Sequence, residues 1–124
     1  MIKKIFITLF LFLCVSANAV EKKTNFSIET FEKAKASGKT IVINSYEVWC
    51  GTCSAQTKVL NQAEKEFKEI IFLSYEQSKN KDIANKLNIK HWTTIVVYKG
   101  NNEVSRIIGQ TKKETIYSAI LEGI

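Results

Sequence analysis

The chain has 124 residues, of which 45% are hydrophobic and 24% are charged, and it contains three cysteines and no proline. This length suits one domain, and the composition is that of a globular protein, which excludes a wholly disordered chain. Three cysteines are too few for a small fold held together by several disulfides. The formal net charge of +6 at pH 7 raises the question of nucleic-acid binding.

The first nineteen residues differ from the rest of the chain. Two lysines precede an apolar run from residue 5 to residue 15, and a small-x-small triplet follows at Ala17–Ala19. A positive start, a short apolar run and such a triplet are typical of a secretory signal peptide. The run is short for a membrane-spanning helix, which needs about 20 residues. We therefore expect residues 1–19 to be removed during export, which leaves residues 20–124 as the mature domain.

Two other interpretations of this segment stay open. It could remain uncleaved as an N-terminal membrane anchor. A lipoprotein signal at Cys14 fits less well, because Leu13 stands where lipoprotein signals resemble one another in having a small residue. Export would place Cys50 and Cys53 in an oxidising compartment, a bacterial periplasm or the cell exterior, where they can form a disulfide.

The basic residues are dispersed along the chain. Most of them alternate with glutamate or polar residues in segments with a helical pattern, where such pairs support a helix and face solvent. The sequence has no basic run and no alternation of basic and aromatic residues. Together with the expected export, this distribution predicts no nucleic-acid partner.

Strand and helix patterns alternate along the mature chain. A short edge strand is expected at residues 24–28, followed by a helix at 29–37 that ends before Gly38, a residue that favours helix ends. The later elements, in chain order, are a buried strand at 40–46, an amphipathic helix at 51–67, a buried strand at 70–75, a short helix at 80–87, a strand at 94–98, its hairpin partner at 103–108, and a last helix opened by a capping box at 111–114.

This order predicts the architecture. Strands joined through helices lie parallel in a sheet, and the final hairpin adds an antiparallel part. We therefore expect an α/β fold of three layers, with a central mixed sheet and helices on both faces. In the helix at 51–67 the expected buried face consists of Ala55, Val59, Leu60, Ala63 and Phe67.

One motif carries the chemistry. The segment Cys50–Cys53 follows the strand at 40–46 and opens the helix at 51–67. The first turn of a helix has free N–H groups and the positive end of the helix dipole, so it stabilises a thiolate and lowers the pKa of the cysteine. A spacing of three residues brings the second sulfur to the same face, near enough for a disulfide. Cys50 is thus the expected exposed nucleophile, and Cys53 the more buried resolving thiol of a thiol–disulfide exchange.

The other roles open to such cysteines are a structural disulfide, a zinc site and covalent haem attachment. A structural disulfide stays open, although a loop this short adds little stability. A zinc site needs four ligands, and Cys50, Cys53 and the single His91 offer three, so no metal is expected. Covalent haem attachment needs a histidine directly after the second cysteine, where this chain has Ser54. The sequence therefore predicts no cofactor.

The segment IVINSYEVWCGTC, with the later TTIVVYKGNNEVSRIIGQTKKETIYSAI, resembles the thioredoxin family. The resemblance extends from about Thr24 to Leu121. It implies the thioredoxin fold, a reversible Cys50–Cys53 disulfide, and protein thiols or disulfides as substrates. A membrane electron donor or acceptor is a further expected partner, and a monomer is the expected state. Reductase, oxidase and isomerase share the motif, and an alternative of another class is a thioredoxin-like protein-binding module with a non-catalytic disulfide.

The chain departs from the family pattern near the motif. Where the family usually has a buried acid, six residues before the first cysteine, this chain has Asn44, so Glu47 is the nearby candidate to assist proton transfer at the resolving thiol. The proline between the family's cysteines corresponds to Thr52, and its cis-proline before the later strand corresponds to Thr93. A cis peptide costs a non-proline residue about 2.5–4 kcal/mol, so we expect a trans bond before Thr93.

These departures predict a tuned redox site. The N–H of Thr52 is expected to donate to the Cys50 sulfur, and Asn44 removes a nearby negative charge. Both changes stabilise the thiolate and predict a more oxidising potential than that of the family's cytosolic reductants. The other expected site residues are Gly51, Trp49 packed over the thiols, and a substrate loop of His91, Trp92 and Thr93.

Overall fold

The computed structural model describes residues 24–124, and the expected signal peptide lies outside the described residues. The elements in this range are α1 (Ile28–Ala36), β1 (Thr40–Tyr46), α2 (Gly51–Glu66), β2 (Ile71–Glu76), the 3₁₀ helix η1 (Gln77–Lys79), α3 (Lys81–Lys86), β3 (Thr94–Lys99), β4 (Asn102–Ile108) and α4 (Lys113–Leu121). Within residues 24–124 no helix has the length and apolar character needed to span a membrane.

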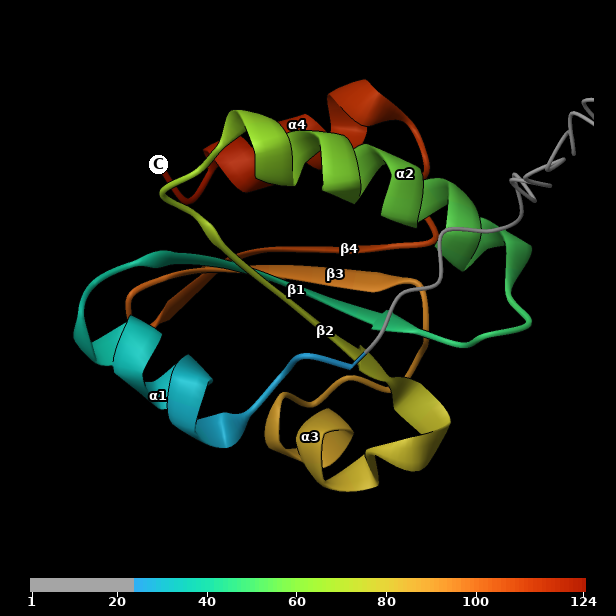
Figure 1. The fold of residues 1–124 in the computed structure, drawn as a ribbon, viewed down its shortest axis with the longest axis horizontal. Helices are drawn as coiled ribbons and strands as arrows, with labels where there is room; N and C mark the ends of the chain where they lie inside the picture. The colour runs from blue at the N-terminus through green and yellow to red at the C-terminus, as the bar shows by residue number, and fades with distance from the viewer. Residues whose placement is uncertain (1–23) are drawn as a thin grey trace, which may run out of the picture.

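The four strands form one mixed sheet in the order β2-β1-β3-β4. β1 runs parallel to β2 and antiparallel to β3, and β3 pairs with β4 as an antiparallel hairpin. Helices α2 and α4 cover one face of this sheet, and α1 and α3 cover the other (Figure 1). The expected three-layer α/β fold is therefore confirmed.

Each face of the sheet has its own hydrophobic core. Side chains alternate between the two faces along a strand, so Ile41 and Ile43 of β1 pack on the α1 and α3 side while Val42 packs on the α2 and α4 side. Every residue of β1 is buried, as a central strand covered on both faces requires. The same alternation puts Asn44 on the side of α2, the helix that begins at the cysteine motif.

The segment before α1 is not the edge strand that the sequence predicted. Residues 24–27 have no regular secondary structure, and Ser27 serves as the N-cap of α1. Asn25 nevertheless lies against β2, because its backbone N–H donates to the carbonyl of Ser74 (3.0 Å) and its side-chain amide donates to the carbonyl of Phe72 (3.2 Å). The Asn25 side chain thus makes a hydrogen bond to β2 that a paired strand would make with its backbone. Because α1 is already capped at Ser27, the segment is too short to pair with β2 as a strand.

Two helices differ from expectation in detail. The predicted capping box of α4 is wrong, because the N-cap is Lys112 rather than Thr111 and no side chain caps the helix there. In α2 the buried face is rotated relative to the predicted one. Gln56 and Thr57 are buried, whereas Ala55 is only partly buried. As a result, the buried face of α2 includes the polar side chains of Gln56 and Thr57, which are close in sequence to the cysteine motif.

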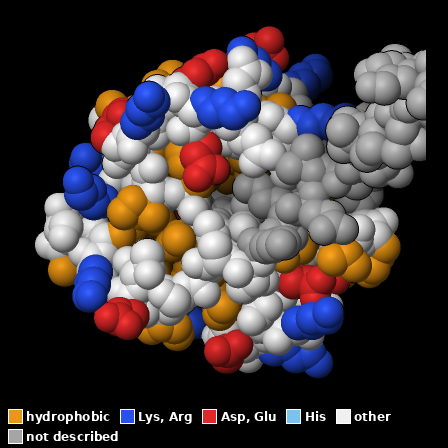
Figure 2. All heavy atoms as spheres, in the orientation of Figure 1, with side chains coloured by type: hydrophobic (Ala, Val, Ile, Leu, Met, Phe, Trp, Pro, Cys, Tyr) orange, Lys and Arg blue, Asp and Glu red, His pale blue; other side chains and the backbone are white. Residues whose placement is uncertain are grey.

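The charged side chains are spread over the surface. On the face drawn in Figure 2, Lys and Arg lie around the rim of the molecule, with Asp and Glu among them. Ion pairs on the helices follow the same pattern, as between Lys33 and Glu29 (3.0 Å) and between Lys35 and Glu32 (3.4 Å). These pairs have the spacing of solvated helix faces.

Candidate active site

The two cysteines lie between the end of β1 and the first turn of α2. Cys50 is the N-cap of α2, with an extended backbone (φ −94°, ψ 111°), and Cys53 follows within the first turn. A disulfide joins them, with their Cα atoms 5.2 Å apart, a usual separation for such a bond. Cys53 is 3% exposed and Cys50 is only partly buried, so Cys50 is the one that a partner can reach.

Two backbone N–H groups in the first turn of α2 donate hydrogen bonds to Cys50. The N–H of Cys53 donates to Sγ of Cys50 (3.1 Å), and the N–H of Ser54 donates to the Cys50 carbonyl (3.1 Å). The sequence pointed to Thr52 as the donor to this sulfur, but an N-cap side chain bonds the N–H two or three residues into the helix. Gly51 and Thr52 are both exposed, and the first turn of this fully described helix carries no acidic residue. The helix dipole therefore acts on Cys50 without an opposing charge nearby in the helix.

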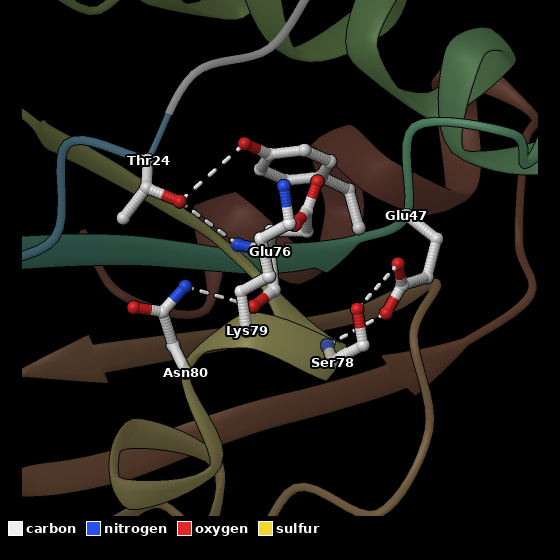
Figure 3. Close-up of polar contacts among 7 residues, drawn as sticks. Thr24, Glu47, Glu76, Ser78, Lys79 and Asn80 are labelled. Atoms are coloured by element: carbon white, nitrogen blue, oxygen red, sulfur yellow. Dashed lines mark hydrogen bonds and ion pairs between the residues drawn. The ribbon is translucent and has the colours of Figure 1, made fainter.

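Asn44 and Glu47 are both buried near the end of β1, with exposed fractions of 3% and 6%. The carboxylate of Glu47 accepts two hydrogen bonds from Ser78 of η1, one from its backbone N–H (2.6 Å) and one from its hydroxyl (3.0 Å) (Figure 3). The Glu47 carbonyl accepts the N–H of Cys50 (3.2 Å). Glu47 thus ties the motif to η1, and its assistance to proton transfer at the resolving thiol stays a prediction.

A second buried carboxylate, Glu76, ends the neighbouring strand β2. Its backbone N–H donates to the hydroxyl of Thr24 (3.0 Å), its carbonyl accepts the side-chain amide of Asn80 (2.9 Å), and its carboxylate lies 3.4 Å from Nζ of Lys79 (Figure 3). These contacts hold η1 and the start of the described chain against β2. Residues 24–124 contain no group of three or more His, Cys, Asp or Glu side chains that could hold a metal ion.

The expected substrate loop lies beside the motif. The ring of Trp92 meets that of Trp49 edge-on, with centroids 5.2 Å apart, and these side chains are 41% and 68% exposed. The bond before Thr93 is trans, as expected, since residues 24–124 contain no cis peptide. Thr93 instead has a φ of +67°, a left-handed conformation that is unusual for a β-branched residue. The His91 side chain is exposed, and its carbonyl accepts the Ser45 hydroxyl (2.8 Å).

Sequence reasoning missed two buried polar residues of this site, Ser45 and Gln56, each 0% exposed. Ser45 contacts the loop from β1, and Gln56 contacts it from α2, where its side-chain amide donates to the carbonyls of Thr93 (3.0 Å) and Gln110 (2.9 Å). One signal could have revealed Gln56. It stands three residues after Cys53, where a polar residue interrupts the inward face of an amphipathic helix.

Comparison with known proteins agrees with this geometry. The thioredoxin family model matches residues 19–122. An H-type thioredoxin of Fagopyrum esculentum is 35% identical over 89 residues, which cover 72% of this chain and 77% of that protein. Thioredoxin-2 of Saccharomyces cerevisiae is 27% identical over 84 residues, 67% of this chain and 81% of that protein.

Solved structures show the same fold. Trxlp from Edwardsiella tarda superposes with a TM-score of 0.73 at 22% identity, over 77% of this chain and 94% of that one. Fasciola hepatica thioredoxin does so with a TM-score of 0.69 at 24% identity, over 77% of this chain and 90% of that one. The solved structures show the fold, and the family match over residues 19–122 with the 35% identity to the Fagopyrum esculentum thioredoxin establishes that the chain belongs to the thioredoxin family.

Proposed function

We propose that this protein is an exported thiol–disulfide oxidoreductase, which exchanges its Cys50–Cys53 disulfide with cysteines of other proteins in a bacterial periplasm. The family match and the cysteine pair identify a thioredoxin-type thiol–disulfide oxidoreductase. The observation that carries the proposal is the position of Cys50, a reachable disulfide sulfur at the N-terminus of α2. The signal-like pattern of residues 1–19 supports export.

The exchange runs in two steps. A substrate thiolate attacks Sγ of Cys50, a mixed disulfide forms, and the bond to Cys53 breaks, so that Cys53 leaves as a thiolate and then takes up a proton. A second substrate thiolate attacks the substrate sulfur of the mixed disulfide and releases Cys50 as a thiolate, which the N–H of Cys53 and the helix terminus stabilise. The substrate dithiol loses two electrons and two protons and becomes a disulfide. The Cys50–Cys53 pair takes up the two electrons, one proton goes to Cys53, and the other goes to solvent while Cys50 stays a thiolate. The reverse steps reduce a substrate disulfide.

The surface next to Cys50 suits protein partners. Val48, Trp49 and Trp92 are large apolar residues exposed beside the motif. Exposed apolar groups of this kind mark surfaces that bind other proteins. Protein thiols or disulfides are therefore the proposed substrates, a membrane electron donor or acceptor the proposed partner that resets the disulfide, and a monomer the proposed state.

A trapping experiment tests the exchange. In Cys53→Ala the Cys50 thiolate can still attack a substrate disulfide, but the resulting mixed disulfide has no resolving thiol. We therefore expect covalent protein adducts that dithiothreitol releases. The double variant Cys50→Ala/Cys53→Ala is the control and should carry no adducts. Absence of adducts on the single variant would favour the non-catalytic binding module, and the identities and redox states of trapped partners would tell reductase from oxidase.

A second experiment tests the location. Cell fractionation with mass determination should find a periplasmic protein that begins at Val20. A full-length protein in the membrane fraction would support the uncleaved anchor, and a full-length protein in the cytoplasm would refute export.

A further inference from the structure

The loop between α3 and β3 adopts a conformation that its own sequence does not favour. Thr93 has a φ of +67°, in the left-handed region that glycine occupies readily and β-branched residues avoid. A residue persists there only when its surroundings hold it. The contacts that hold Thr93 therefore decide where the loop lies.

Three hydrogen bonds fix the backbone of Thr93. Its N–H donates to the carbonyl of Ser45 at the end of β1 (3.0 Å). Its carbonyl accepts the N–H of Gly109, just after β4 (3.0 Å), and the side-chain amide of Gln56 (3.0 Å). The first two contacts come from β1 and from the residue that follows β4. The third comes from α2, the helix that carries the disulfide.

The Gln56 side chain acts as a hydrogen-bond donor. Its side chain is 0% exposed, and Nε2 donates both to Thr93 and to the carbonyl of Gln110 (2.9 Å). Two carbonyls can be satisfied only by the amide nitrogen, which settles the orientation of the amide. Its Oε1 is buried without a hydrogen-bond partner among residues 24–124. A buried unpaired acceptor costs stability, so an amide here is explained by the two bonds it donates rather than by the stability of the core.

We propose that Gln56 is a positioning residue for the exchange reaction. It holds the Thr93 backbone, and with it the adjoining Trp92, at a set place beside the N-terminus of α2, so that a protein substrate meets a preformed surface next to Cys50. The edge-on contact of Trp92 with Trp49 shows how near the loop lies to the motif. The inference rests on the proposed function, since it concerns how substrates of that exchange dock.

The test compares a protein substrate with a small one. In Gln56→Leu, which has a similar volume but no donor, kcat/KM for insulin disulfide reduction driven by dithiothreitol should fall about tenfold, mainly through KM, as expected when a preformed docking loop is released. Reduction of the small disulfide 5,5′-dithiobis(2-nitrobenzoate) should change less than about twofold, because it reaches Cys50 without the loop.

Amide hydrogen exchange measures how firmly the loop is held. In Gln56→Leu the amides of Thr93 and Gly109 should exchange at least about tenfold faster, while those of Ile43 and Val96 in the central strands keep their protection. The matched control is Gln62→Leu, the same change on the exposed face of α2, which should alter none of these quantities.

A double variant tests the strain. Glycine adopts a positive φ freely, so a loop with Thr93→Gly needs less holding. Gln56→Leu should therefore raise KM for insulin less in the Thr93→Gly background than in the wild type, a coupling that two independent structural losses would not produce.

Failure of this inference can be distinguished from failure of the proposed function. A folded Gln56→Leu protein with wild-type KM for insulin, or with equal losses on both substrates and unchanged exchange at Thr93, overturns the proposal. If Gln56→Leu does not fold, Gln56→Asn, which keeps the amide but shortens it, must show the same rise in KM or the proposal fails. A wild-type protein that reduces neither substrate refutes the proposed function, and this inference with it, before any variant is measured.

Discussion

Asn44 presents a neutral amide, 3% exposed, on the side of the sheet that α2 covers. A buried carboxylate near the thiols would raise the pKa of the Cys53 thiol and disfavour its thiolate, and an amide has no such effect. At the same time Sγ of Cys50 accepts the N–H of Cys53 at the helix terminus. We expect both features to stabilise the reduced form of the pair, and a stable reduced form makes the disulfide a stronger oxidant.

The reduction potential tests this argument. We expect the reduction potential of the wild type to lie above the value of about −270 mV that is typical of thioredoxin. Asn44→Asp should lower the potential by about 20–30 mV, which corresponds to about 1 kcal/mol for two electrons. Equilibration with glutathione buffers, followed by alkylation of the free thiols, gives the value. Asn101→Asp in the exposed turn between β3 and β4 is the control. An unchanged or raised potential in Asn44→Asp contradicts the role given to this residue.

At the scale of the elements, one side chain joins α3 to β4. Arg106 of β4 is the only arginine of the chain. Its guanidinium donates to the carbonyls of Leu87 (2.9 Å) and Asn88 (3.0 Å), which follow α3, and it forms an ion pair with Glu103. The hydrogen bond to Glu103 is the main cause that raises the pKa of Arg106. Arg106 thus satisfies carbonyls that the end of a helix leaves unpaired, and it anchors the start of the segment that leads to Thr93.

Arg106→Lys should lower the free energy of unfolding by about 1–2 kcal/mol, because one ammonium cannot serve two carbonyls and a carboxylate in the geometry of a planar fork. Urea unfolding followed by circular dichroism measures the change. The exposed Lys99→Arg on β3 is the control and should stay within about 0.5 kcal/mol of the wild type. A similarly small effect in Arg106→Lys would show that these bonds do not anchor the loop.

For the whole molecule, the core on the α1 and α3 side contains an ionisable group. Tyr75 is 0% exposed, and its hydroxyl donates to the side-chain carbonyl of Gln77 (2.7 Å). Burial is the main cause that raises the pKa of Tyr75, and burial also raises the pKa of Tyr98 on the same side of the sheet. The folded protein therefore keeps the Tyr75 proton at a pH where the unfolded chain releases it. This contribution to stability is complete below about pH 10 and is lost as the pH rises further.

Tyr75→Phe should remove this pH dependence. Between pH 10 and pH 11 the free energy of unfolding of the wild type should fall more steeply than that of Tyr75→Phe, with a difference of at most about 1.4 kcal/mol per pH unit for one group. Urea unfolding at pH 8, 10 and 11 gives both slopes. At pH 8 Tyr75→Phe should be less stable than the wild type only because it lacks the hydrogen bond to Gln77. Parallel slopes above pH 10 would refute the role of Tyr75.

The features that depend on neighbours in the sequence were predictable. The β-branched run at Thr40–Tyr46 forms a strand with the predicted bounds, and α2 begins at Gly51, directly after Cys50. The predictions that were wrong concern segments for which more than one local structure was available. Residues 24–27 could have extended a strand, but Ser27 begins a helix and Asn25 uses its side chain against β2.

The sequence by itself determined the cysteine pair, the strand before it, the helix after it and the layers of the fold, because hydrophobic period and turn residues act over a few positions. Only the tertiary structure decided what surrounds the pair. The left-handed Thr93, the Gln56 amide that holds it, and the Trp49–Trp92 contact each depend on residues more than thirty positions apart. Such contacts exist because the antiparallel pairing of β1 with β3 brings the end of β1 to the start of β3. No local sequence pattern indicates which side chain will then meet which carbonyl.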